Sequence, residues 1–211
     1  MSKKFLLFDL DGTISDPLEG IGRSINYALE SFGYSTRPLS DLAKYVGPPL
    51  DESFKAITGS SNDIEISELI AKYRERYAEV GYSENILYSG IELAINILAE
   101  KCIPMAICTS KRQDFADKIL CMFGLRKYFQ FVSGGDIGIS KWQQIGLLLS
   151  DKVINQQTLM IGDRAVDLTA AHKNGIGSVG VLWGYGSRSE LESEHPRYLL
   201  AQTSELINLA G

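Results

Sequence analysis

The fold of this chain is decided by residues 5–15, which read Phe-Leu-Leu-Phe-Asp-Leu-Asp-Gly-Thr-Ile-Ser. The apolar run at its start predicts a buried strand that leads directly into Asp9 and Asp11. A turn at Asp11 and Gly12 would bring both carboxylates to one pocket at the carboxyl end of the strand, where open α/β sheets bind ligands. Two carboxylates held close together repel each other, so the pair predicts a hard divalent cation with oxygen ligands. An Asp-Gly turn at a strand end is also common without any chemistry, so the rest of the chain must decide.

The composition is that of a globular protein that binds neither nucleic acid nor a membrane. Hydrophobic residues make up 45% of the chain, and no apolar run approaches the ~18 residues that span a bilayer. The net charge is -5 without any basic block, whereas nucleic-acid and membrane surfaces require a cationic footprint. The N-terminus lacks the length and cleavage site of a secretory signal, so we expect a cytoplasmic protein with small polar or anionic ligands.

The cysteines and histidines predict neither a disulfide framework nor a zinc site. Cys102, Cys108 and Cys121 have no CxxC spacing and no nearby histidine cluster, so we expect small buried hydrophobic residues. His172 is expected in the last turn of a helix and His195 in a polar loop, both at the surface.

Strand and helix patterns alternate along most of the chain. Strands are predicted at 4–10, 103–109, 129–133, 157–162 and 176–182. Helices are predicted after a capping pair of Ser89 and Glu92, after Ser140, and over 165–173, where Asn174 and a glycine end the last one. This alternation predicts an α/β fold with a Rossmann-like parallel sheet core flanked by helices.

The stretch between the first two of these strands is too long for an ordinary connection and must have structure of its own. Asp16 as N-cap and Pro17 at the first helical position predict one helix, and 50–57 and 64–80 predict two more. We therefore expect a small helical cap domain at 15–88, inserted after the first strand, and a catalytic core of 1–14 and 89–211. A cap that begins directly after the Asp pair could cover the pocket and exclude water.

Three further polar clusters stand where predicted strands end or helices begin. Thr109 and Ser110 follow a buried strand and could donate hydrogen bonds to an anionic oxygen, although a helix cap is the commoner use of such residues. Lys141 lies in the first turn of a helix, where the dipole disfavours a cation unless an anion compensates; a solvated surface lysine is the alternative. Asp163 and Asp167 could face the same way and bind metal, or could serve as an N-cap and a first-turn acid.

Two nucleotide-binding motifs are excluded. The glycines of 175–180 match GxGxxG, but they precede a predicted strand and cannot present a helix N-terminus to a pyrophosphate. The chain contains no GxxxxGK[ST] sequence, which excludes a P-loop kinase.

Taken in order, DxDGT, a strand followed by Thr-Ser, a downstream lysine and GDxxxD resemble the four motifs of the haloacid dehalogenase superfamily, and the match spans the chain. The segments 47–50, 162–164 and 183–188 resemble its phosphoglycolate-phosphatase and 5′-nucleotidase-like subgroup. One departure is Trp142, which follows Lys141 where many relatives have proline; this leaves the amine in place and puts substrate preference in question.

The resemblance implies a phosphatase that forms an aspartyl-phosphate. Asp9 would be the nucleophile, and Asp11 would be the general acid and base. Mg2+ would be held by Asp9, the main-chain carbonyl of Asp11 and Asp163, and Asp167 would orient a metal-bound water or Lys141. The groups that would bind the phosphoryl oxygens are Thr109, the Ser110 amide and Lys141.

The implied partner is a small phosphorylated metabolite, of the phosphoglycolate or the nucleoside 5′-monophosphate type, and the protein would be a monomer or homodimer. One alternative stays open: a phosphoryl-accepting signalling switch also uses an aspartate, a hydroxyl and a lysine around Mg2+. A switch needs a lasting phospho-aspartate, whereas Asp11 and a cap favour turnover.

Overall fold

The computed structural model describes residues 4–135 and 139–211. The chain divides into two compact units, one built from Met1–Asp16 and Leu87–Gly211 and the other from Pro17–Ile86. We call them the α/β unit and the helical unit.

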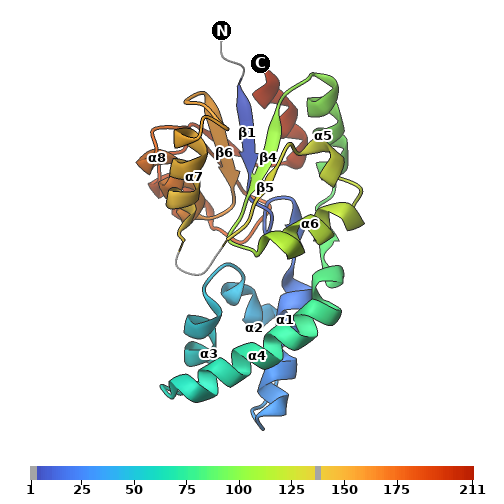
Figure 1. Cartoon of the computed structure of the whole chain (residues 1–211), viewed down its shortest axis with the longest axis vertical. Coiled ribbons are helices and arrows are strands. Elements are labelled where there is room, and N and C mark those ends of the chain that lie inside the picture. Colours follow the sequence, from blue (N-terminus) through green and yellow to red (C-terminus); the bar gives the residue numbers. More distant parts are fainter. Residues whose placement is uncertain (1–3, 136–138) are drawn as a thin grey trace. The chain divides into compact units, whose positions relative to one another are not determined.

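The α/β unit is built on a six-stranded sheet with the order β5-β4-β1-β6-β7-β8, in which every neighbouring pair is parallel. Figure 1 labels its strands β5, β4, β1 and β6. The strands are β1 (Phe5–Phe8), β4 (Met105–Cys108), β5 (Val132–Ser133), β6 (Thr158–Gly162), β7 (Gly177–Val181) and β8 (Tyr198–Leu200). The first five confirm the predicted strands with shorter bounds, and β8 was not expected. The predicted parallel sheet flanked by helices is confirmed.

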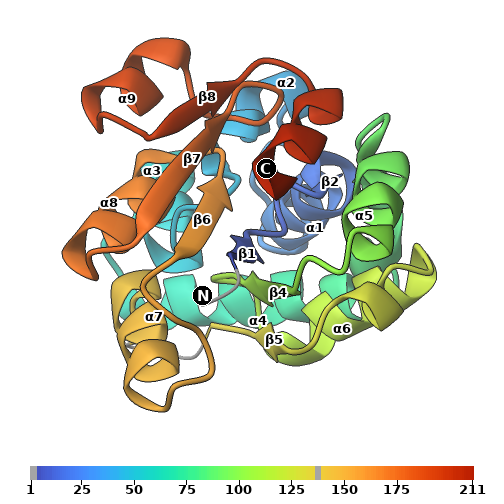
Figure 2. The same ribbon diagram turned by 90° about the horizontal axis from the view of Figure 1, so that it is seen from above.

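Helices cover both faces of this sheet, as Figure 2 shows. On one side lie α5 (Ile91–Glu100) and α6 (Gln113–Met122), and on the other α7 (Lys141–Ser150) and α8 (Ala165–Lys173). This placement of the helices follows from the strand order. Along the sheet, the chain moves in one direction from β1 through β4 to β5 and in the opposite direction from β6 to β7. Because the crossovers are right-handed, opposite directions place the connecting helices on opposite faces. Three shorter segments complete the unit: η3 (Arg126–Tyr128), α9 (Arg188–Ser193) and η4 (Thr203–Ala210).

The central strand β1 is buried along its whole length. Leu6 pairs with Met105 of β4 on one side and with Leu159 of β6 on the other. Leu7 and its neighbour Met160 are fully buried in a core cluster that α7 and α8 close. A strand with two parallel neighbours and two covered faces must be apolar throughout, which explains the unbroken run of four hydrophobic residues.

The helical unit contains α1 (Leu18–Ser31), α2 (Leu39–Leu42), η1 (Ala43–Tyr45), α3 (Leu50–Thr58), α4 (Asp63–Glu79) and η2 (Gly81–Glu84). The three predicted helices of this stretch are therefore confirmed. Its core is formed by apolar faces of α1, α3 and α4, with Leu29, Phe54 and Leu69 fully buried. Two short strands, β2 (Ser15–Asp16) and β3 (Ile86–Leu87), pair where the chain passes between the units.

Two predicted helix caps are wrong. Pro17, not Asp16, precedes α1 directly, and the Asp16 carboxylate instead accepts a hydrogen bond from the hydroxyl of Tyr185. Gly90, not Ser89, precedes α5; its φ of 83° is left-handed, and the Ser89 carbonyl accepts a hydrogen bond from Thr203. For Asp16, a tertiary hydrogen bond takes the side chain that would have formed the cap.

The cysteine prediction is wrong for two of three residues. Cys108 is buried, but Cys102 and Cys121 are exposed, and all three are free thiols. His172 and His195 are exposed, as expected. Among the described residues, none of the helices has the length and hydropathy needed to cross a bilayer.

Candidate active site

The predicted site residues converge because the sheet order places their strands side by side. Phe8 of β1 pairs with Ile107 of β4 and with Ile161 of β6. The residues that follow these strands, among them Asp9 and Asp163, therefore emerge at one edge of the sheet. This is the edge at which open α/β sheets bind ligands.

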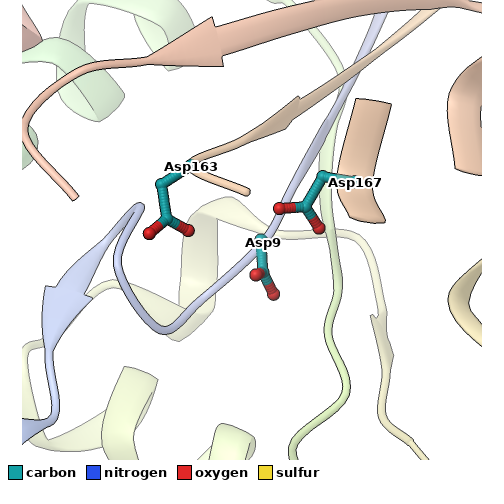
Figure 3. A group of neighbouring side chains, drawn as sticks. All are labelled: Asp9, Asp163 and Asp167. Atoms are coloured by element: carbon teal, nitrogen blue, oxygen red, sulfur yellow. The ribbon is translucent and has the colours of Figure 1, made fainter. Parts of the chain in front are cut away.

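Three buried aspartates form the centre of the site. Asp9 follows β1, Asp163 follows β6, and Asp167 lies in the first turn of α8 (Figure 3). They are 8%, 1% and 0% exposed, and one carboxylate oxygen of each lies within 4.8 Å of one from each of the others. Asp163 and Asp167 thus face the same way, as expected from their spacing. Asp163 is not the N-cap of α8, a position that Arg164 occupies, whereas the Asp167 carboxylate accepts the Arg164 N–H at 3.2 Å.

Lys141 is the cation of this centre. Its Nζ lies 3.0 Å from Asp9 Oδ1 and forms a shorter ion pair with Asp167. With 3% of its surface exposed, Lys141 is not a solvated lysine, and that alternative is wrong. Burial disfavours the ammonium ion, but Asp167 and Asp9 more than offset this and raise the pKa of Lys141.

The site carries more negative than positive charge, since one lysine faces three carboxylates. Burial, together with Asp167 and Asp9, raises the pKa of Asp163 to about 8. Burial also raises the pKa of Asp167 to about 6 against the opposing effect of Lys141. Carboxylates that bind protons this readily lack a compensating cation, and an all-oxygen donor set fits a hard ion such as Mg2+.

Asp11 is not one of the three clustered aspartates and forms an ion pair with Lys111. No role was predicted for Lys111 from the sequence. Lys111 Nζ lies 2.8 Å from Asp11 Oδ2, and both side chains are largely buried. Burial raises the pKa of Asp11, and the ammonium ion of Lys111 opposes the shift. Asp11 Oδ1 has no hydrogen-bond partner among the described residues. Lys111 could have been found as the first cation after the Thr-Ser pair.

The turn between Asp9 and Ser15 requires Gly12. This residue has a φ of 80°, and its N–H donates to the Ser15 carbonyl at 2.8 Å. A Cβ at this position would lie 2.1 Å from Asp163 Oδ2. The glycine therefore allows the loop of residues 9–15 to approach Asp163, the candidate metal ligand that follows β6.

Thr109 and Ser110 lie at the end of β4 as predicted. Thr109 is 1% exposed, and its Oγ1 accepts the N–H of Lys111 at 3.2 Å, whereas Ser110 is exposed. Neither residue caps α6, because Arg112 stands at the N-cap. The helix-cap interpretation of this pair is wrong, so the hydroxyl and amide groups remain candidates for holding an anion.

A segment far along the chain also reaches the site. The N–H of Tyr185 donates to Asp163 Oδ2 at 2.8 Å, and the indole N–H of Trp183 donates to the carbonyl of Thr13 at 3.0 Å. The sequence interpretation gave these residues no role. The available signal was the pair of glycines, Gly184 and Gly186, which is typical of close backbone approach.

Comparisons with known proteins agree with this geometry. Residues 6–181 match the model of the haloacid dehalogenase-like hydrolase family. A 5′-nucleotidase of Pseudomonas aeruginosa is 33% identical over 205 residues, which cover 95% of this chain and 92% of that protein. A phosphoglycolate phosphatase of Vibrio parahaemolyticus is 29% identical over 223 residues, covering 99% and 96%. The solved structure of protein tyrosine kinase A (PtkA) of Mycobacterium tuberculosis superposes with a TM-score of 0.84 at 30% identity and covers 100% of this chain and 99% of that one.

Proposed function

Because the chain belongs to the haloacid dehalogenase-like hydrolase family, as a phosphatase, we propose that it hydrolyses a small phosphate monoester with Mg2+ through a phosphorylated Asp9. The observation that carries the proposal is the position of Asp9, whose buried carboxylate ends the central strand and faces Lys141. A carboxylate in this position can act as a nucleophile while the ammonium ion offsets the charge of an incoming phosphoryl group.

In the first step, a carboxylate oxygen of Asp9 attacks phosphorus and the bond from phosphorus to the leaving oxygen breaks. The leaving alkoxide takes a proton from Asp11, whose raised pKa favours the protonated form that this step needs. In the second step, Asp11 takes a proton from water, the water oxygen attacks phosphorus, and the Asp9 carboxylate is released together with inorganic phosphate.

The residues that would hold Mg2+ are Asp9, Asp163 and the main-chain carbonyl of Asp11. When bound, the ion would supply positive charge that offsets the negative charge of the phosphoryl oxygens and of the carboxylates. Asp167 lies in the same cluster, and its ion pair with Lys141 supports a role in orienting that lysine or a metal-bound water.

Thr109, Ser110 and Lys141 would bind the phosphoryl oxygens. The first two stand at the end of β4, beside β1 in the sheet, and Lys141 lies against Asp9 from α7. Donors and a cation around the nucleophile stabilise the charge that the transferring group carries in its loose transition state.

The relatives support the proposed substrate class. Phosphoglycolate and nucleoside 5′-monophosphates are both small monoesters, and the helical unit would act as a cap that selects between such leaving groups. We expect kcat/KM to differ widely over a panel of these esters.

The deciding experiment measures phosphate release from phosphoglycolate, nucleoside 5′-monophosphates and p-nitrophenyl phosphate with Mg2+ and with excess chelator. We expect turnover only with Mg2+, no turnover in Asp9→Asn, and unchanged turnover in Asp151→Asn, which alters an exposed aspartate at the end of α7. Full turnover in chelator would contradict the metal requirement, and an active Asp9→Asn variant would contradict the nucleophile.

Resemblance to a tyrosine kinase makes phosphoryl transfer a second candidate. The same preparation should therefore be incubated with ATP and a tyrosine peptide, and the lifetime of the phosphorylated aspartate should be followed. Phosphotyrosine formation would favour transfer over hydrolysis. A phospho-aspartate that persists for minutes or longer would favour the signalling switch.

A further inference from the structure

The segment from Trp183 to Gly186 holds the acidic site from one side, yet the proposed reaction does not use it. The N–H of Tyr185 donates to Asp163 Oδ2 at 2.8 Å, and the indole of Trp183 donates to the Thr13 carbonyl at 3.0 Å. The segment therefore contacts both Asp163, the candidate metal ligand that follows β6, and the loop that follows Asp9.

The two glycines of the segment allow this contact. A Cβ at Gly184 would lie 2.4 Å from Asp163 Cβ and 2.4 Å from the carbonyl oxygen of Gly12. A Cβ at Gly186 would lie 1.9 Å from the carbonyl oxygen of Asp163. A larger residue at either position would force Asp163 or the aspartate loop to move.

The side chain of Tyr185 is itself held by a hydrogen bond. Its hydroxyl donates to Asp16 Oδ1, and the ring is partly buried. Asp16 is the last residue of the α/β unit before the chain enters the helical unit, and it makes this bond in place of the helix cap expected from the sequence. Burial, reinforced by Asp16, raises the pKa of Tyr185, so the hydroxyl keeps its proton and remains a donor.

We propose that Tyr185 is a positioning residue whose amide orients Asp163 for metal binding and whose hydroxyl, held by Asp16, keeps that amide in place. The inference rests on the proposed function, because it takes Asp163 as a metal ligand. It links the geometry of the metal site to the residue at which the chain leaves the α/β unit. A hydrogen bond that orients a coordinating side chain raises the affinity for the metal ion, because that side chain then loses less conformational freedom when the ion binds.

The test measures Mn2+ affinity by electron paramagnetic resonance, with Mn2+ as a probe for the Mg2+ site. Tyr185→Phe keeps the amide and the ring and removes only the hydroxyl, and we expect the dissociation constant to rise about 10-fold. Asp16→Ala should give a similar loss, and the double variant should lose no more than either single variant, because both changes remove the same hydrogen bond. Asp16→Asn keeps an acceptor oxygen and should retain most of the affinity.

Tyr128→Phe is the matched control, since it removes a hydroxyl from another partly buried tyrosine of the α/β unit, in η3 before β5, and should leave the Mn2+ affinity unchanged. In Tyr185→Phe, kcat at saturating Mg2+ should approach the wild-type value, because the defect lies in ion binding. Unchanged affinity in Tyr185→Phe, additive losses in the double variant, or a kcat that stays low at saturating Mg2+ would each overturn the inference. A wild-type chain that binds no Mn2+ would instead overturn the proposed metal site.

Discussion

The ammonium group of Lys141 lies at the amino-terminus of α7, where the helix dipole disfavours a cation. Its burial adds a desolvation cost, which the adjacent Asp167 and Asp9 offset. Such an arrangement contributes little net stability, since well-packed apolar residues of similar volume are often as stabilising or more so. At the scale of single residues, Lys141 and its aspartates therefore concentrate charge in the site and add little to the stability of the fold.

Asp163 shows the same conflict, and it leads to a prediction about pH. In chelator, we expect Asp163→Asn to raise the free energy of unfolding by about 1–3 kcal/mol above pH 8, because a neutral amide replaces a carboxylate that burial and its neighbours disfavour. The folded pKa of about 8 lies above the reference value of 3.8. The stability that this group contributes is therefore present below about pH 4 and is lost as the pH rises towards 8.

Urea unfolding at several pH values would measure this difference, which should vanish near pH 4 and grow towards pH 8. At high pH, added Mg2+ should make the wild type more stable to unfolding than Asp163→Asn, since the ion would stabilise only the wild type. A variant that is less stable than the wild type at every pH in chelator would contradict the prediction.

Asp11 can be separated from Asp9 by the choice of leaving group. We expect Asp11→Asn to slow hydrolysis of an alkyl phosphate by about 10²- to 10⁴-fold, because the alkoxide leaves badly without a proton donor. An aryl ester needs no such help, so it should still phosphorylate Asp9 and give a burst of phenol of about one equivalent per site. The steady state that follows should be slow because the water has lost its base. Stopped-flow absorbance checks this, and equal slowing of both esters without a burst would exclude the acid-base role.

At the scale of elements, the carboxylate of Glu190 lies at the start of α8, the helix that carries Asp167. It accepts the N–H of Ala165 at 2.9 Å and pairs with Arg164 at 2.9 Å. Burial opposes ionisation, but these partners lower the pKa of Glu190. We expect Glu190→Gln to cost about 0.5–1 kcal/mol at neutral pH, through loss of a negative charge at a helix N-terminus.

Thermal unfolding measures this cost, and Glu192→Gln, which breaks an exposed pair with Arg188, is the matched control with little effect. Because the folded pKa of Glu190 is lowered, its contribution is present above the unfolded pKa and is lost as the pH falls through the folded pKa. The difference between Glu190→Gln and the wild type should therefore disappear in acid. A difference that is constant with pH would contradict the charge argument.

The sequence predicts elements best where their own residues carry the signal. The apolar run of β1 and the spacing of Asp163 and Asp167 are local patterns, and both expectations were confirmed. The contacts of Lys111 with Asp11 and of Tyr185 with Asp16 join residues that are distant in the chain. Local patterns, such as a lysine after the Thr-Ser pair or glycines beside Tyr185, can mark these segments but cannot identify their partners. Helix caps gave a mixed outcome: Ser140 is the N-cap of α7 as expected, whereas Asp16 does not cap α1 and its carboxylate instead accepts a tertiary hydrogen bond.

At the scale of the whole molecule, the chemistry and the choice of substrate fall to different parts of the chain. Every candidate site residue lies in the α/β unit, whereas the helical unit of Pro17–Ile86 contains none of them. An enzyme discriminates between substrates through contacts with groups that do not react, and the proposed function assigns this selection to the helical unit.

We therefore expect substitutions at 47–50 of the helical unit, such as Leu50→Ala, to change the ranking of substrates. The kcat/KM ratio between phosphoglycolate and a nucleoside 5′-monophosphate should shift by about 10-fold or more, because a truncated side chain removes contacts that one leaving group uses more than another. The rate with p-nitrophenyl phosphate should change less, since this ester offers few contacts to lose. Ile64→Ala, at a residue 73% exposed on α4, is the matched control and should leave the ranking unchanged. If Leu50→Ala slows all substrates by one factor, this segment supports the fold and specificity must reside in the α/β unit.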